Sequence, residues 1–294
     1  MRPLFSFPPL LICAVMASSL QADTLRHLGT YVWPTPAFEG LSGLEVSDDG
    51  HTFHAVSDRG WFLSGTLARD DTAITGVTLQ SYLPILGQDG WPVAGRRVGD
   101  QSDAEGLAVA PDGSLWISFE RWARVARYQT PTSPAEWIKD HPDFNGYRDN
   151  RQLEALALSP DGRLFTFAEV PQGKHFPIYR LDGTTWIIAG QIARQNRFSI
   201  AGADFGPDGR LYLLERKLVM GLWWQSRVRR MDVENPDIDE TLWTSRRGEF
   251  NNVEGIAVWR DTGGGTRITM VSDDNGDPDE PTQFIEFWLE QTLD

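Results

Sequence analysis

The chain has 294 residues with 41 acidic and 27 basic side chains, so its formal net charge is -14 at pH 7. A chain this acidic lacks the basic surface that binds a phosphate backbone, which argues against nucleic acid as a partner. Its single cysteine, Cys13, lies in the N-terminal segment, so we expect no disulfide and no thiol chemistry in the rest of the chain.

The N-terminal 22 residues have the layout of a Sec-type signal peptide. Arg2 supplies a positive charge, residues 3–18 form an apolar stretch, and Ser19 and Ala22 belong to a small-residue exit. The stretch is too short for a membrane-spanning helix, and no other segment approaches that length. We therefore expect residues 1–22 to be removed, and residues 23–294 to form one periplasmic or secreted domain without an integral membrane segment.

Internal repetition is the strongest pattern in the remaining chain. Each repeat has an apolar run, a turn and a second apolar run, and three of the turns are Pro-Asp-Gly, a tripeptide that favours hairpins. The first parts of the repeats are residues 42–50, 105–113, 154–162, 201–209 and 254–259, and the second runs are 53–57, 115–119, 164–168, 211–214 and 268–272. Because two further strand-like runs follow each hairpin, every repeat is typical of a four-stranded propeller blade.

The two ends of the chain complete the pattern. The last repeat has only three strands, ending with residues 283–289, whereas residues 27–33 near the N-terminus have no partner. The sequence therefore predicts an all-β propeller of five four-stranded blades, in which the N-terminal strand closes the last blade and protects its edge. Six blades remain an alternative, because the first repeat runs on through residues 87–102. We expect the tryptophans to fill the wedges between blades.

Acidic residues recur at two aligned positions of the repeats. The innermost strands begin with Ser42, Glu105, Glu154, Ala201 and Glu254, and the second strands end at Asp58, Glu120, Glu169, Glu215 and the cluster 273–275. In a propeller such positions converge on the central channel, where crowded carboxylates repel one another unless a cation holds them. A single acid of this kind could equally cap a turn. Recurrence at one aligned position is what favours a channel site.

An oxygen-rich ligand set suits Ca²⁺ best, with Mg²⁺ or Mn²⁺ as alternatives. The ligands that we expect are Glu105, Glu154, Glu254, Asp58, Asp273 and Asn275.

Several of these segments together resemble a known family. The segments are 57–60, 103–108, 119–121, 153–157 and 252–257, and their order and spacing are similar to those of the phytase-like family of secreted bacterial propellers called "esterase-like activity of phytase". The resemblance covers most of the chain after residue 22. It implies a hydrolytic, phosphoester-directed activity supported by the recurrent acids Glu105, Glu120, Glu154, Glu169 and Glu254. The fourth repeat departs from the pattern, because Ala201 replaces the glutamate.

Metal-dependent hydrolysis of an anionic ester needs a metal to polarise the phosphoryl or acyl oxygen, a water to attack, and a cationic side chain for the remaining charge of the substrate. Glu120 or Glu169 could accept a proton from the attacking water. Arg59 and Arg121 are candidates to bind an anionic substrate group through two hydrogen bonds, although either could instead form a structural salt bridge. The sequence therefore predicts a monomeric, metal-dependent hydrolase of a small anionic ester, with a phosphoester as first choice.

Two other functions stay open. A lactonase-like hydrolase uses a similar channel metal, and a non-catalytic propeller stabilised by calcium could bind a ligand or an envelope protein at the same rim. Neither a Gly-x-Ser-x-Gly motif, a phosphate-binding glycine loop nor a His-Glu-x-x-His motif occurs in the sequence.

Overall fold

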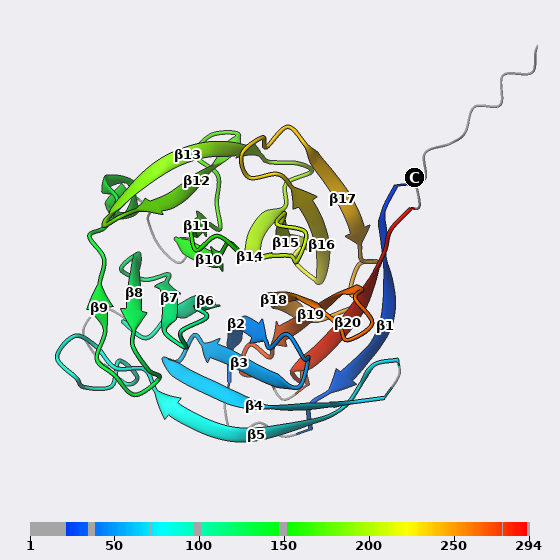
Figure 1. Cartoon of the computed structure of the whole chain (residues 1–294), viewed down its shortest axis with the longest axis horizontal. Coiled ribbons are helices and arrows are strands. Elements are labelled where there is room, and N and C mark those ends of the chain that lie inside the picture. The colour runs from blue at the N-terminus through cyan, green and yellow to red at the C-terminus, as the bar shows by residue number, and fades with distance from the viewer. Residues whose placement is uncertain are drawn as a thin grey trace, which may run out of the picture.

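The computed structural model describes residues 22–34, 39–70, 72–96, 101–146, 152–277 and 279–292. Within these residues the strands form five antiparallel sheets of four strands each, arranged in a ring around a central axis (Figure 1). The predicted five-bladed propeller is confirmed. The expected signal peptide falls almost wholly on residues 1–21, outside the described part of the chain.

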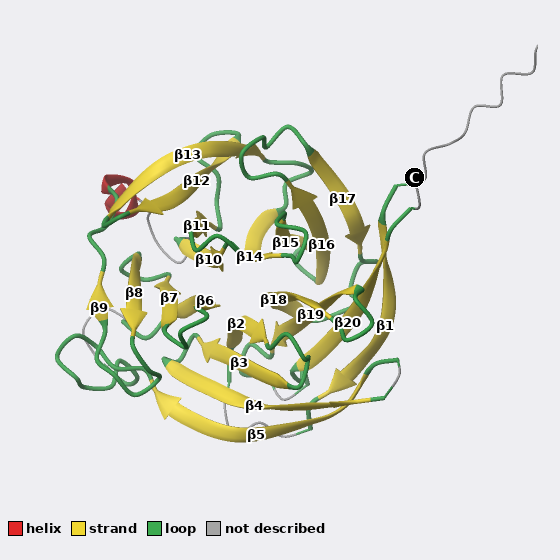
Figure 2. Cartoon of the chain, in the orientation of Figure 1, coloured by secondary structure: helices red, strands yellow, loops and turns green. Residues whose placement is uncertain are grey.

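The blades follow the order of the repeats, from the innermost strand outward (Figure 2). Blade 1 contains β2 (Leu41–Val46), β3 (Thr52–Ser57), β4 (Trp61–Arg69) and β5 (Ile74–Pro84); blade 2 contains β6 (Ala104–Val109), β7 (Leu115–Phe119), β8 (Arg124–Tyr128) and β9 (Glu136–Trp137). Blade 3 contains β10 (Leu153–Leu158), β11 (Leu164–Ala168), β12 (His175–Asp182) and β13 (Thr185–Ala193); blade 4 contains β14 (Ser199–Phe205), β15 (Leu211–Val219), β16 (Trp223–Met231) and β17 (Asp239–Thr244). A 3₁₀ turn, η1 (Pro142–Gly146), lies between blades 2 and 3.

Blade 5 joins the two ends of the chain. It contains β18 (Asn252–Arg260), β19 (Thr266–Asp273), β20 (Gln283–Glu290) and, as its outermost strand, β1 (Thr24–Val32). β1 pairs with β20 over its whole length, from Thr24 opposite Glu290 to Val32 opposite Gln283. The predicted closure of the last blade by the N-terminal strand is therefore confirmed, and an edge of β20 that would otherwise be open is covered.

The innermost hairpins of blades 2, 3 and 4 owe their shape to Pro-Asp-Gly turns. Gly113, Gly162 and Gly209 have φ values of +82°, +84° and +74°, which glycine adopts without the steric cost that a β-carbon brings. In the first of these turns the Asp112 carboxylate accepts hydrogen bonds from the amide and hydroxyl of Ser114. The turn sequence therefore fixes where the innermost strand ends in these three blades.

The hydrophobic interior is divided into five clusters, one between each pair of neighbouring blades. Tyr212 and Leu214 of blade 4, for example, pack with Ile268 and Met270 of blade 5. Tryptophans such as Trp33 and Trp259 fill the wedge between blades 5 and 1, as expected. Other tryptophans do not: Trp91, Trp122, Trp137 and Trp223 are exposed.

Candidate metal and substrate site

A β-bulge lies at the start of the innermost strand in every blade. In β6, Ala104 pairs with Phe119 and Leu107 with Ile117, so that Glu105 and Gly106 together face a single partner residue. The same shift brackets Glu154 in β10 and Glu254 in β18. A bulge turns its extra side chain out of the regular alternation. The recurring glutamates are therefore the bulged residues, and all three line one small cavity on the axis.

The residue after the bulge sets how closely the blades approach. A β-carbon on Gly106 would lie 2.6 Å from the backbone nitrogen of Leu156 in the next blade, and one on Gly255 would lie 2.3 Å from the Ser42 carbonyl oxygen. Because the innermost backbones almost touch here, the cavity that remains has a volume of only about 10 Å³, room for one water. The acidic side chains thus gather at one mouth of a channel that is nearly closed below them.

Backbone pairing defines a second ring at this mouth. The amides of Asp58, Glu120 and Glu169 donate to the carbonyls of the residues that precede each innermost strand, at 2.9 Å in all three blades. In blade 5 the equivalent residue is Asp273, which pairs with Asn252. In blade 4 it is Arg216, which pairs with Ser199. The ring therefore consists of Asp58, Glu120, Glu169, Arg216 and Asp273.

The sequence alignment of the fourth repeat was wrong by one residue. It assigned Glu215 to the ring, but a shift of one residue in a strand moves a side chain to the opposite face. Glu215 is instead buried inside blade 4, where Arg227 donates to it at 2.7 Å and Arg229 at 3.0 Å. The Glu215 carboxylate therefore forms ion pairs within blade 4 and does not face the channel.

Arg216 forms ion pairs with two of the channel glutamates, and it was not expected from the sequence. Its guanidinium donates to Glu154 at 2.6 Å and also forms an ion pair with Glu254. It donates to the side-chain oxygen of Asn252 at 2.8 Å and lies 4.0 Å from Glu169. The sequence did contain a hint of this role, because Ala201 breaks the glutamate pattern in blade 4. The blade that lacks the inner glutamate supplies a cation for the glutamates of blades 3 and 5.

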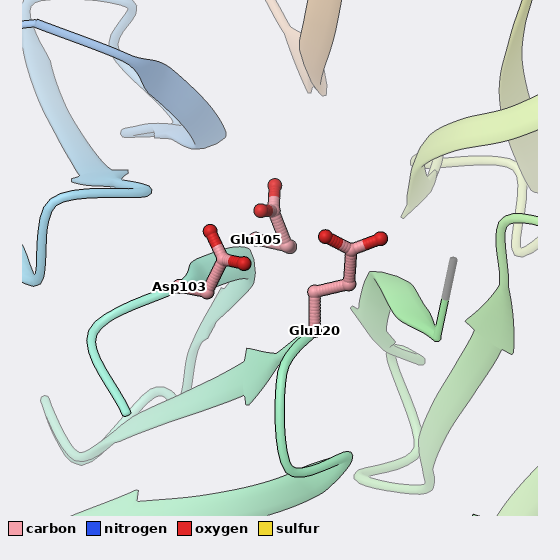
Figure 3. A group of neighbouring side chains, drawn as sticks. All are labelled: Asp103, Glu105 and Glu120. Atoms are coloured by element: carbon pink, nitrogen blue, oxygen red, sulfur yellow. The ribbon is translucent and has the colours of Figure 1, made fainter. Parts of the chain in front are cut away.

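Three carboxyl groups form the best candidate metal site among the described residues. One oxygen from each of Asp103, Glu105 and Glu120 lies within 4.8 Å of the others (Figure 3). Asp103 precedes β6, Glu105 is the bulge residue and Glu120 follows β7, so one hairpin of blade 2 supplies the whole group. From the sequence we expect Glu105 as a ligand and Glu120 as a base, whereas Asp103 is a ligand candidate that only the structure reveals.

Burial raises the pKa of all three carboxyl groups. It raises the pKa of Glu120 to about 9, helped by the nearby charges of Glu154 and Asp103, and that of Asp103 to about 6. The pKa of Glu105 is raised as well, through burial and then through Glu154. A divalent cation would favour the ionised forms that the site itself disfavours. Three hard oxygen donors on one face fit Ca²⁺, Mg²⁺ or Mn²⁺.

Three further predicted ligands, Asp58, Asp273 and Asn275, come from blades 1 and 5. Burial raises the pKa of Asp58 to about 7, with further contributions from Asp273, Asp103 and Asp274. Asp273 accepts a hydrogen bond from the Asn275 amide at 2.8 Å, and the Asn275 side-chain oxygen accepts one from Asn252 at 3.2 Å. Asp273 and Asn275 are thus joined by hydrogen bonds, whereas one carboxylate oxygen of Asp58 is buried without a hydrogen-bond partner among the described residues.

Both predicted substrate-binding arginines lie at this mouth. The Arg59 Nε atom is 3.6 Å from carboxylate oxygens of Asp58 and Glu39, and its side chain is 55% exposed. The Arg121 Nε atom is 3.3 Å from Asp103, with 37% of the side chain exposed. Each arginine therefore pairs with a carboxylate of the mouth, while part of its side chain is exposed to solvent.

Solved structures with similar folds have very different sequences. A protein of unknown function from Dyadobacter fermentans has a TM-score of 0.50 at 10% identity, and the match covers 90% of this chain and 99% of that one. An α-L-arabinofuranosidase of Podospora anserina reaches 0.53 at 13% identity, covering 92% and 98%. An exo-β-1,3-galactanase of Phanerochaete chrysosporium reaches 0.51 at 11% identity, covering 91% and 65%. At these identities the likeness concerns the fold alone.

Sequence comparison gives the family. No curated protein matches the chain. None of the helices in the described residues is long and apolar enough to cross a membrane. The sequence model of the phytase-like family, "Esterase-like activity of phytase", matches residues 36–276, which include every residue of the candidate site. The chain belongs to this phytase-like family.

Proposed function

We propose that the protein is a metal-dependent hydrolase of a small anionic ester, with a phosphoester as first choice. The observation that carries the proposal is the group Asp103, Glu105 and Glu120, whose oxygens gather within 4.8 Å at the mouth of the channel. Arg121 lies 3.3 Å from Asp103 and offers a positive charge beside this group. The family to which the chain belongs supports a hydrolytic activity.

The three carboxylates would hold the cation, Ca²⁺ first and Mg²⁺ or Mn²⁺ as alternatives. A cation bound there would polarise the ester oxygen and acidify a bound water. Glu169, which lies outside the three-carboxylate group, is the proposed proton acceptor, and Arg121 and Arg59 would bind the anionic oxygens of the substrate. Asp58, Asp273 and Asn275 would supply further oxygen donors from blades 1 and 5. We assign Glu154 and Glu254 a structural role, because their ion pairs with Arg216 hold blades 3, 4 and 5 together at the channel mouth.

The test is turnover of a substrate panel by metal-free protein before and after addition of Ca²⁺, Mg²⁺ or Mn²⁺. The panel contains phosphomonoesters, phosphodiesters, aryl esters and lactones. We expect a phosphoester to be hydrolysed only with metal, and a chelator to abolish turnover. Preference for lactones would favour the lactonase-like alternative. If the protein binds metal but hydrolyses no compound of the panel, the enzyme hypothesis fails and a non-catalytic binding propeller is favoured.

Two substitutions separate metal binding from substrate binding. Glu105→Gln keeps the size of the side chain but removes one ligand charge, so metal affinity and kcat/KM should both fall at least about tenfold. Arg121→Lys should leave metal affinity unchanged and lower kcat/KM, because an ammonium lacks the two-pronged guanidinium geometry. Calorimetric titration with metal and steady-state kinetics measure the two effects.

The matched control is Glu290→Gln on the outer strand β20, where Glu290 pairs with the exposed Arg26. It should change neither quantity. If the Glu105 and Arg121 variants are as active as the unmodified protein, hydrolysis takes place away from this mouth.

Export to the periplasm or the medium, and a monomeric state, are parts of the same proposal. The proposed export rests on the sequence of residues 1–22. Expression of the full chain should give a product that begins near Asp23, and light scattering should give the mass of one chain. A product that keeps residues 1–22 would remove the proposed localisation.

A further inference from the structure

A cavity of about 300 Å³ lies on blade 2, next to the three-carboxylate group. Its lining includes Trp122, Trp137, Phe144, Asp140, Asn145 and Gln152. Trp122 is only two residues after Glu120, and Gln152 precedes β10 at the channel mouth, so the cavity and the candidate metal site share the same hairpin and the same rim. This volume is at the lower end of the usual range for small-molecule sites.

The two tryptophans present their rings to solvent. Trp122 is 54% exposed and Trp137 is 44% exposed, whereas Trp33, Trp186 and Trp259 are buried between or within blades. Exposed indoles close together contribute little to the packing of a propeller. Paired in one cavity with polar side chains, they are typical of a ligand site instead.

The backbone at Trp122 is held in a conformation that tryptophan disfavours. Its φ of +58° lies in the left-handed region, which costs a residue with a β-carbon about 1–2 kcal/mol. Arg124 fixes this turn, since its guanidinium donates to the carbonyls of Arg121 at 3.2 Å and Trp122 at 3.1 Å. The side chain of Gln152 accepts a hydrogen bond from the Ala123 amide at 2.8 Å. Glycine would relieve the strain, so an indole at this position calls for a role outside folding.

The charges of the cavity indicate what it can bind. Arg124 is buried, its guanidinium lies 3.7 Å from the centroid of the Phe119 ring, and it also donates to the Gln101 carbonyl at 2.6 Å. The Arg124 guanidinium therefore donates its hydrogen bonds to backbone carbonyls and packs on the Phe119 ring. The negative charge of Asp140 partly offsets its positive charge. With the amides of Asn145 and Gln152, the lining offers hydrogen bonds for hydroxyl groups and no surplus of positive charge for a phosphate.

We propose that this cavity binds the neutral, polyhydroxylated ring of the substrate, a sugar ring, against Trp122 and Trp137. Its C–H faces would pack on the indoles while its hydroxyls bond to Asp140, Asn145 and Gln152. The ester group of the same molecule would then lie at the three-carboxylate group. This inference rests on the proposed function for the identity of the ester, but binding of the ring itself can be measured without any hydrolysis.

The experiment is calorimetric titration of the full chain with neutral pentoses, hexoses and disaccharides that carry no ester, and with phenol as the aromatic competitor. We expect at least one saccharide to bind. Trp122→Gly and Trp137→Ala should each weaken that binding at least tenfold. The matched control, Trp91→Ala, removes an indole that is 69% exposed outside the cavity and should leave it unchanged.

Trp122→Gly also distinguishes a ligand site from a structural role. Because glycine relieves the positive φ, this variant should melt at the same temperature as the unmodified protein or higher while binding is lost. A large drop in melting temperature would mean that the indole serves folding, which would overturn the inference.

Absence of saccharide binding, tighter binding of phenol, or equal weakening in Trp91→Ala would each overturn it as well. Failure of the proposed function looks different: saccharides would still bind, and Trp122→Gly would still abolish binding, while no ester in the panel was hydrolysed. If sugar phosphates are substrates, Trp122→Gly should raise KM for them and leave KM for a short alkyl phosphate unchanged.

Discussion

Arg216 reaches from β15 to the bulged glutamates of two neighbouring blades, Glu154 and Glu254. All three side chains are largely buried, so removing the guanidinium leaves carboxylates that can neither be solvated nor paired. Even with Arg216 present, burial raises the pKa of Glu154 to about 8. Compensation of the buried charges of Glu154 and Glu254 therefore depends on this side chain.

Arg216→Met should lower the free energy of unfolding by about 3 kcal/mol or more at pH 8, the usual cost of breaking a buried ion pair. At pH 5 the loss should be smaller, because the orphaned carboxyls can be protonated. Denaturant unfolding at the two pH values measures this. The control Arg26→Met breaks an exposed pair with Glu290 and should cost less than about 1 kcal/mol at either pH. Equal losses for both variants would contradict this account of Arg216.

The raised pKa values also predict how stability varies with pH in metal-free protein. Folding raises the pKa of Asp103 to about 6, of Asp58 to about 7 and of Glu120 to about 9. From about pH 4 to 9 the folded chain therefore binds more protons than the unfolded chain, and stability falls as pH rises. Exposed acids with lowered pKa, such as Asp70 at about 2, titrate below this range.

We accordingly expect the melting temperature in chelator to decrease from pH 5 to pH 9. Added Ca²⁺ should raise it most at the alkaline end, because a cation binds the ionised carboxylates of the folded chain only. Thermal melts at pH 5, 7 and 9 with chelator or Ca²⁺ test both statements. A melting temperature that rises with pH in chelator would show that these groups are ionised without metal.

The site could be predicted from sequence only as far as its spacing is regular. Glu105, Glu154 and Glu254 recur at one aligned position, and the structure does bring them to one cavity. Arg216 was missed because strands alternate with a period of two, so an error of one residue selected Glu215, which faces the other way. Asp103 was missed because it precedes the repeated segment. Neither error alters the positions of the apolar residues in the strands, so the hydrophobic pattern could not reveal either of them.

At the scale of elements, the innermost hairpins carry both the fold and the site. The Pro-Asp-Gly turns and the apolar runs predicted the strands well, because turn chemistry is local. The bulge could not be predicted, since one extra residue at the start of a strand leaves the pattern after it unchanged. Gly106 shows what the bulge requires: a β-carbon there would meet the Leu156 nitrogen at 2.6 Å and the Ser118 hydroxyl oxygen at 2.6 Å.

Gly106→Ala should therefore destabilise the protein by about 1–3 kcal/mol, as overpacking of an interior does. It should also weaken metal binding, because Glu105 is its neighbour in the bulge. The matched control is Gly76→Ala in the outer strand β5, where the nearest atom would be the Ala68 β-carbon at 3.5 Å. That variant should be neutral or slightly stabilised. Chemical denaturation with metal titration compares the two, and similar stability of both variants would contradict the close approach of blades 2 and 3.

At the scale of the whole molecule, the ends of the chain meet in blade 5. The Thr292 amide donates to Asp23 at 2.9 Å, and β1 lies beside β20 (Figure 1). This closure could be predicted because the count of strands left one partner missing at each end. The number of blades followed from the same count, and the described part of residues 87–102, which made six blades an alternative, adds no strand to any sheet.

A circular permutant should keep the fold. A short glycine-serine linker would join Thr292 to Asp23, and new ends would be opened at the exposed Asp112–Gly113 turn, away from the acidic mouth. We expect a melting temperature within about 5 °C of that of the original chain, and unchanged metal affinity. Deletion of residues 24–32 should instead unfold or aggregate the chain, since β20 becomes an open edge. A permutant that fails to fold while the deletion variant folds would refute this view of the closure.

The pairing of β1 with β20 also determines the order in which the blades can fold and the ring can close. Arg26 and Glu290, which form an ion pair across this seam, are 264 residues apart in the chain. Contacts so distant in sequence form late, because the entropy of closing a long loop must be overcome before they contribute. Blades 1 to 4 can each assemble from consecutive residues, whereas blade 5 must wait for the last strand. A nascent or truncated chain is therefore an open arc, and only a chain that carries both ends becomes a ring.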